Sequence, residues 1–170
     1  MATPIHVRDS VRQIDSTSWL IGRSHILRHI QGPYDGDCLW KNTTTANSCY
    51  TLSPAPSPPP CTTPLLPDDP HVRQIHDAGN ASAVFSFGNE IIIKVRIACD
   101  GTRREPETLA FLARHRQRLS FDIPTVLFYA EEDGKTFLCE PHVRGRRLNE
   151  AWWDMGEERR ENVVARVAAR

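Results

Sequence analysis

The sequence has little of what would place it in a class at once. It carries no net charge, since 21 lysine and arginine residues balance 21 aspartate and glutamate residues. A chain without excess charge has no long-range positive field with which to gather nucleic acid or an anionic membrane surface. We therefore expect neither nucleic acid nor a membrane among its partners.

Leader sequences and membrane spans leave patterns that this sequence does not have. Residues 1–19 contain no basic stretch followed by an apolar one, and no segment approaches the roughly 18 consecutive apolar residues that cross a membrane. The five cysteines are odd in number and irregularly spaced, which disfavours a disulfide framework. Because reduced thiols are typical of the cytosol, we expect a cytoplasmic protein.

Proline, by contrast, is concentrated in one stretch. Residues 51–70 read TLSPAPSPPPCTTPLLPDDP, in which proline recurs too often for a helix or an interior strand. Together with the polar residues before them, they predict a proline-rich linker over residues 41–70, and a plain spacer is favoured over a ligand for proline-binding domains. Residues 1–40 carry only a mixed apolar pattern, and we expect a poorly ordered N-terminal segment there.

From residue 71 onward the pattern becomes regular. Two strands joined by a small-residue turn, and a third strand EIIIKVRIA rich in β-branched residues, precede a helical pattern over residues 103–116. Two further strands follow, joined by an Asp133-Gly134 turn. This order predicts an α+β domain over residues 71–150, with a five-stranded antiparallel sheet and one packed helix. An amphipathic pattern over residues 151–170 predicts a C-terminal helix.

One lysine of the third strand is a candidate for binding an anion. Lys94 closes an apolar run on a strand, so its side chain is expected to be half buried and to need an anionic partner. Glu105 is a candidate partner, since its spacing from Leu109 and Leu112 places it on the helix stripe that faces the sheet. The alternatives are a lysine that reaches solvent at a strand end, and a helix-capping box of Thr102 and Glu105.

This ordered set resembles the small lobe of the protein-kinase-like superfamily, and most closely the aminoglycoside-phosphotransferase family in its fungal form. The resemblance covers residues 71–165. It depends on the turn that begins at Gly79, the strand EIIIKV, the helix EPETLAFL, and the segments IPTVLFYAEEDGKTFL and EPHVRGRRLNEAW. It implies a nucleotide-binding lobe in which Lys94 grips the α- and β-phosphates of ATP and Glu105 holds that lysine in place.

The resemblance also implies how the rest of the nucleotide is held. Counting back from Gly145, the Pro141 carbonyl and the Val143 N–H fall where family members bind adenine through the backbone. Proline stands where the family usually has an acidic residue. Gly79 and the small residues after it would let backbone N–H groups approach a phosphate.

The catalytic part of the family pattern is not found beyond this hinge. Phosphoryl transfer also needs a base or positioning aspartate and a metal-binding aspartate, which belong to the large lobe. No HxD-type loop and no DFG-like motif follows Val143, and Asp154, the only aspartate there, fits a helix cap better. We therefore predict no catalytic and no metal-binding residue in this chain, weak binding of ATP at most, and no Mg²⁺ without the missing lobe.

These observations favour a truncated kinase-like domain with residues 151–170 as the start of the second lobe. The alternatives are a non-catalytic interaction or regulatory module, and a fragment of an active small-molecule kinase. Trp152 and Trp153 lie just beyond the hinge, in a run where the resembling family has an Ala-Trp pair that packs between lobes. Aromatic residues exposed there would favour a protein partner or self-association.

Overall fold

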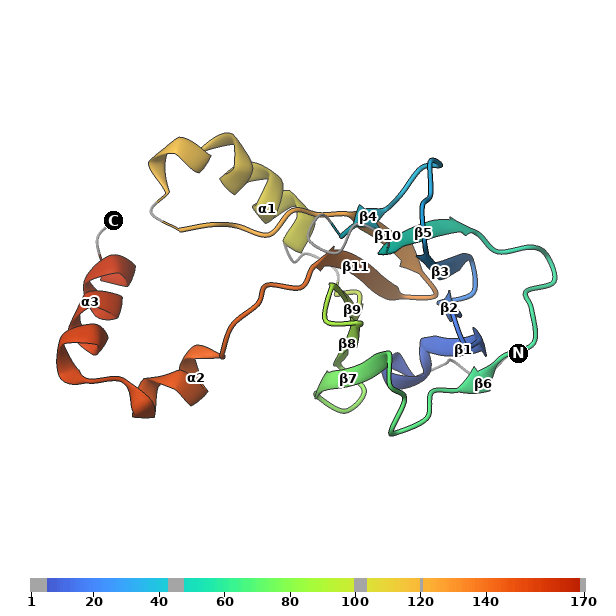
Figure 1. The fold of residues 1–170 in the computed structure, drawn as a ribbon, viewed down its shortest axis with the longest axis horizontal. Helices are drawn as coiled ribbons and strands as arrows, with labels where there is room; N and C mark the ends of the chain where they lie inside the picture. The colour runs from blue at the N-terminus through green and yellow to red at the C-terminus, as the bar shows by residue number, and fades with distance from the viewer. Residues whose placement is uncertain (1–5, 43–47, 100–103, 120, 169–170) are drawn as a thin grey trace.

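The computed structural model describes residues 6–42, 48–99, 104–119 and 121–168. Its strands form two antiparallel sheets that share one hydrophobic core, and its helices lie away from that core (Figure 1). The predicted mixture of helices and mostly antiparallel sheet is thus confirmed. Within the described residues, no helix is both long and apolar enough to span a membrane.

The predicted five-stranded sheet is present. Its strands are β7 (Val72–Asp77), β8 (Ser82–Phe87), β9 (Ile91–Ile97), β10 (Phe128–Glu132) and β11 (Lys135–Pro141). They lie in the order β10-β11-β9-β8-β7, and all neighbouring strands are antiparallel. Asn89 and Asp133 stand in the hairpin turns with φ of 56° and 51°, a left-handed conformation that asparagine and aspartate tolerate better than other side chains.

Six strands between Val11 and Pro64 form a second sheet, which corrects the expectation of a poorly ordered N-terminal segment followed by a linker over residues 41–70. After the short 3-10 helix η1 (Val7–Asp9) come the strands β1 (Val11–Asp15), β2 (Ser18–Ile21), β3 (His25–Gln31), β4 (Trp40–Lys41), β5 (Ser48–Pro54) and β6 (Thr63–Pro64). The order β4-β5-β3-β2-β1-β6 is antiparallel throughout. Within the expected linker, residues 55–62 have no strand or helix.

Two physical reasons explain why this sheet was not predicted. In β3 the inward-facing residues are Leu27 and His29, and a buried histidine interrupts the apolar alternation that signals a strand. β5 ends at Pro54, which pairs with His25 at the last position of the ladder. Proline is tolerated at this position because the strand does not continue beyond it. Since Pro54 is also the first of a series of prolines, the whole of β5 was assigned to the proline-rich linker.

The core lies between the two sheets. Its largest members are Trp19, Ile21, Leu27 and Tyr50 from the first sheet and Phe85, Phe87, Ile91, Ile93, Val95 and Phe137 from the second. Because side chains alternate along a strand, the residues between them on β9 face the other way, toward the helix. The five-stranded sheet therefore has one face covered by the N-terminal sheet and a second face left for α1.

A polar and aromatic cluster ties the two sheets together inside this core. The Tyr50 hydroxyl and His71 Nε2 are 2.6 Å apart, and His29 Nε2 is 2.8 Å from Ser48 Oγ. The ring of Trp19 stacks on His71, with centroids 5.1 Å apart and planes 7° from parallel. Burial is the main cause that lowers the pKa of both His29 and His71. We call these side chains the histidine cluster.

The helices pack less tightly than the sheets. α1 (Glu105–Arg114) is shorter than predicted, is followed by the 3-10 helix η2 (Arg116–Arg118), and contains no buried residue. Its residue Leu109 is half-buried and lines a cavity of about 360 Å³ together with Ile123 and Val126.

The predicted C-terminal helix is interrupted. The segment consists of α2 (Leu148–Ala151), the 3-10 helix η3 (Trp152–Asp154) and α3 (Glu157–Ala168). Met155 is extended, with φ −82° and ψ 136°, and ends η3. Gly156, which lowers helix propensity, separates η3 from α3.

Candidate functional site

Lys94 lies on the face of the five-stranded sheet that α1 approaches. It is in β9, the third strand of this sheet along the chain, opposite Val84 of β8 and Leu138 of β11. Directly paired residues of antiparallel strands share a face, so these three side chains lie side by side. The Lys94 side chain is only 20% exposed, which contradicts the alternative of a lysine that extends into solvent.

Two carboxylates hold the Lys94 ammonium group. Its Nζ is 2.6 Å from Glu105 Oε1 and 2.7 Å from Glu140 Oε2. The predicted approach of Lys94 and Glu105 is thus confirmed. Burial alone would disfavour the charged amine, but the hydrogen bonds and charges of the two carboxylates outweigh it and raise the pKa of Lys94. Lys94 therefore stays protonated at neutral pH.

Glu105 reaches this position from the first turn of α1. Its second oxygen is 3.4 Å from Arg96 Nη1, two residues further along β9. Thr102, the other member of the alternative capping box, lies outside the described residues. Arg104 is the N-cap and makes no side-chain capping bond. Through its contacts with Lys94 and Arg96, the Glu105 carboxylate joins α1 to strand β9.

Glu140 was not predicted as a site residue, and it is the most buried charged group here. It is 1% exposed, and its Oε1 has no hydrogen-bond partner among the described residues. Its position could have been found from the alternation in FLCEP, because Glu140 and Leu138 lie two apart on one strand and so share the face that carries Lys94. A buried carboxylate of this kind requires a cation, and Lys94 is that cation.

Gly79 lies in the turn at the Lys94 end of the sheet, but its N–H is already hydrogen-bonded within the turn. The turn between β7 and β8 is at the same end of the sheet as Lys94, since Ser82 of β8 pairs with Arg96 of β9. Gly79 has a φ of 63°, and its N–H donates to Asp77 Oδ1 at 2.8 Å. In this conformation that N–H is not free to bind a phosphate.

The predicted hinge residues follow β11. Pro141 is the last residue of that strand and pairs with Ile91, and the N–H of His142 donates to the Glu90 carbonyl at 2.8 Å. Val143 is 73% exposed, and its N–H has no partner among the described residues. The structure therefore leaves the Val143 N–H open. Glu140, three residues before Val143, contacts Lys94 and so connects the hinge segment to the lysine.

The residues beyond the hinge form a separate exposed surface. Trp153 is 76% exposed, whereas Trp152 is half-buried beneath the guanidinium group of Arg160, which lies 5.7 Å from the ring centroid. Asp154 pairs with Arg146 Nη2 at 2.6 Å. Its carboxylate is thus engaged with a cation. Within the described part of the chain, no group of three or more His, Cys, Asp or Glu side chains is placed to hold a metal ion.

The chemistry open to this arrangement is the binding of an anion in competition with two carboxylates. Lys94 and Arg96 carry two positive charges, and Glu105 and Glu140 carry two negative ones. The Lys94 ammonium group has three N–H donors, and the two carboxylates take two of them. An incoming phosphate would therefore find one donor left and would compete with the charges of both carboxylates. A comparison with protein-family models finds no match for this chain, and a comparison with curated proteins finds no significant match either.

Proposed function

We propose that residues 71–150 are a kinase-like nucleotide-binding lobe of the aminoglycoside-phosphotransferase type, which binds ATP weakly. The observation that carries the proposal is the 2.6 Å ion pair between Lys94 on the third strand and Glu105 on the following helix. Protein kinases use a lysine of the third strand, paired with a helix glutamate, to hold nucleotide phosphates. Pro141 and Val143 would bind the adenine ring through their backbone groups.

Two features support weak binding. Glu140 already occupies Lys94 at 2.7 Å, so phosphate and carboxylate compete for one cation. Good small-molecule sites bury about 70 to 90% of the ligand surface, whereas one lobe covers a single side of the nucleotide. We expect a Kd of about 1 mM or weaker, which corresponds to about −4 kcal/mol.

The same reasoning supports the absence of phosphate transfer by this chain alone. Transfer needs aspartates that bind magnesium and position the acceptor hydroxyl group. Asp154, the only aspartate after Val143 in the 170 residues, is paired with Arg146 at 2.6 Å. The resembling family acts on antibiotics, amines and sugars, and the phosphate acceptor belongs to the part of the family pattern that these residues do not include.

Calorimetric titration of the full chain with ATP, with and without Mg²⁺, tests the proposal. A Lys94→Met/Glu140→Leu double variant removes the cation without leaving a buried unpaired charge, and should abolish binding. Glu140→Gln removes the competing charge and should tighten binding severalfold. Lys41→Ala, an exposed lysine on β4, is the matched control and should bind as the unmodified chain does.

Two results would contradict the proposal. ATP binding that persists unchanged in the double variant would show that Lys94 does not hold the phosphates. Magnesium-dependent binding at low micromolar Kd, or release of phosphate that is lost in the double variant, would show a catalytic apparatus in this chain.

A second candidate, a non-catalytic interaction module, is favoured by one observation. Trp153 is 76% exposed, and tryptophan is enriched at protein interfaces because it buries a large apolar area there. For this candidate we propose that the chain self-associates through the surface formed by Trp152 and Trp153. Sedimentation of the unmodified chain should show a concentration-dependent mass that Trp153→Ser removes, and a monomer at every concentration would argue against it.

A further inference from the structure

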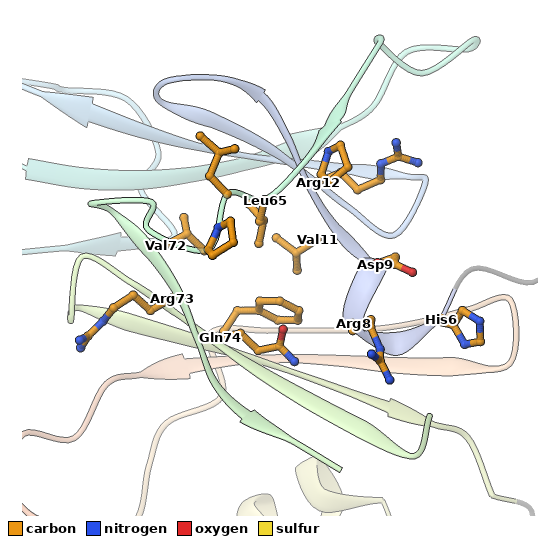
Figure 2. A pocket seen from close by; sticks show the side chains of 13 residues that line it. His6, Arg8, Asp9, Val11, Arg12, Leu65, Val72, Arg73 and Gln74 are labelled. Carbon is orange, nitrogen blue, oxygen red and sulfur yellow. The ribbon is translucent and has the colours of Figure 1, made fainter. Parts of the chain in front are cut away.

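A cavity opens at the edge where the two sheets separate, on the side away from Lys94. β6 is the last strand of the first sheet and β7 the last strand of the second, and residues 65–71 connect them across the opening. The cavity has a volume of about 680 Å³ and is shown in Figure 2. Pockets that bind small molecules typically measure about 300 to 1,000 Å³, so the cavity has the size of a ligand site.

The floor of this cavity is apolar. It is formed by Val11 of β1, Val72 of β7 and Phe85 of β8, all of them buried core residues, with Leu65 packed against them. Leu66 also lines the cavity and is 65% exposed. An apolar ligand lying here would cover Leu66 and extend the core, which is favourable in proportion to the area removed from water.

The rim carries an excess of positive charge. Arg8, Arg12 and Arg73 line the cavity, and Asp9 is the single acidic residue among the lining side chains. The guanidinium groups of Arg8 and Arg12 have no ion pair or hydrogen bond with any described residue. Unpaired guanidinium groups beside an apolar floor are complementary to an anion that has an apolar body.

The arrangement of the side chains narrows the class of ligand. Gln74 pairs with Phe85 across the two strands, so its amide shares the face that lines the cavity, and Figure 2 shows Gln74 and Arg8 on the same side of the cavity. One guanidinium and one amide donor suit a carboxylate. The Asp9 carboxylate, on the same rim, disfavours a multiply charged anion such as a nucleotide.

We propose that this cavity binds an apolar monocarboxylate, such as a medium-chain fatty acid. Its carboxylate would lie against Arg8 and Gln74, and its chain over Val11, Leu65 and Phe85. The site is independent of the nucleotide site, because Phe85 and Val84 are consecutive on β8 and Val84 shares the opposite face with Lys94.

Calorimetric titration of the full chain with decanoate, decan-1-ol and inorganic phosphate tests this proposal. Decanoate should bind saturably, decan-1-ol about tenfold more weakly because it lacks the charge, and phosphate not at all. Arg8→Gln should weaken decanoate binding about tenfold and leave decan-1-ol binding unchanged. Arg118→Gln, an exposed arginine on η2, is the matched control and should change neither.

A second variant tests the apolar half of the site. Leu66→Ser changes an exposed side chain, so it preserves the fold while it removes part of the apolar contact, and it should weaken both decanoate and decan-1-ol binding. The proposal is overturned if decanoate fails to saturate, if decan-1-ol binds as tightly as decanoate, or if phosphate competes with decanoate. ATP binding should be unchanged in both variants, which keeps this test separate from that of the nucleotide site.

Discussion

The two faces of the five-stranded sheet are made by the same strands, but only one of them carries a network of charged side chains among its apolar residues. On β9, Ile91, Ile93 and Val95 are buried against the N-terminal sheet. On the other face Lys94 contacts Glu105 and Glu140, and Arg96 contacts Glu105. The first face is held by packed apolar area, and the second adds a few ion pairs to its apolar contacts. The packing of the first face and the ion pairs of the second can therefore be disturbed separately.

The largest expected effect is on the apolar face. Phe87 is buried in the core against Trp19 and Tyr50, and Phe87→Ala should lower the free energy of unfolding by about 3 to 5 kcal/mol. Leu109→Ala on α1, which has no buried residue, should cost about 1 kcal/mol or less. Urea denaturation followed by circular dichroism measures both. Equal losses would show that α1 contributes as much to stability as the N-terminal sheet does.

The next effect is on the polar face. Lys94→Ala leaves the Glu140 carboxylate buried without its cation, and should cost about 3 kcal/mol. The Lys94→Met/Glu140→Leu double variant replaces the pair by apolar groups and should fall within about 1 kcal/mol of the unmodified chain. The same denaturation experiment compares them. A double variant less stable than Lys94→Ala would mean that the ion pair itself, and not the unpaired charge, determines stability on this face.

A third effect concerns the histidine cluster between the sheets, and it depends on pH. His29 and His71 have a folded-state pKa below the ordinary value of 6.5, mainly because of burial. The unfolded chain therefore binds more protons than the folded chain as pH falls through 6.5. The contribution of these two imidazoles to stability is complete above that pH and is lost progressively below it.

Urea midpoints measured at closely spaced pH values between about 7.5 and 5.5 check this sign. The midpoint should fall with pH, and more steeply for the unmodified chain than for His29→Gln. His25 faces Phe128 with ring centroids 4.8 Å apart, and His25→Gln is the matched control. A midpoint independent of pH in this range would show that the imidazoles of His29 and His71 do not contribute.

The sequence predicted one sheet and missed the other for reasons that lie in particular residues. The strands of the five-stranded sheet are rich in β-branched and aromatic residues and are separated by turn residues such as Asn89 and Asp133, so local pattern was sufficient. The N-terminal sheet buries His29 and Tyr50, whose polar atoms are satisfied by His71 and Ser48 from other segments. Such partners are known only once the chain is folded, and a one-dimensional pattern does not contain them.

The site shows the same division between local and long-range information. Lys94 and Glu105 are eleven residues apart and were paired from strand and helix periodicity. Glu140 joins them only through the pairing of β9 with β11, because Leu138 lies opposite Lys94. The burial that makes Glu140 important is a property of the assembled sheet, although the alternation within β11 carried a signal for its direction.

The smallest expected effect on stability separates the two carboxylates of Lys94. Glu105 is 31% exposed, and Glu105→Gln removes its charge while Glu140 still holds the ammonium group at 2.7 Å. The loss should be about 1 kcal/mol or less, as for other partly exposed ion pairs. The helix also keeps the pair of Arg104 with Glu131 at 2.8 Å, so it stays docked. If the polar face binds ATP, Glu105→Gln should weaken ATP binding in calorimetry although it changes the free energy of unfolding only slightly. In the proposed site Glu105 positions Lys94 and does not itself touch the nucleotide, so Glu105→Asp should restore part of the affinity. A variant with unchanged stability and unchanged affinity would show that Glu105 merely neutralises charge, and that the polar face is an ion-pair network without a ligand.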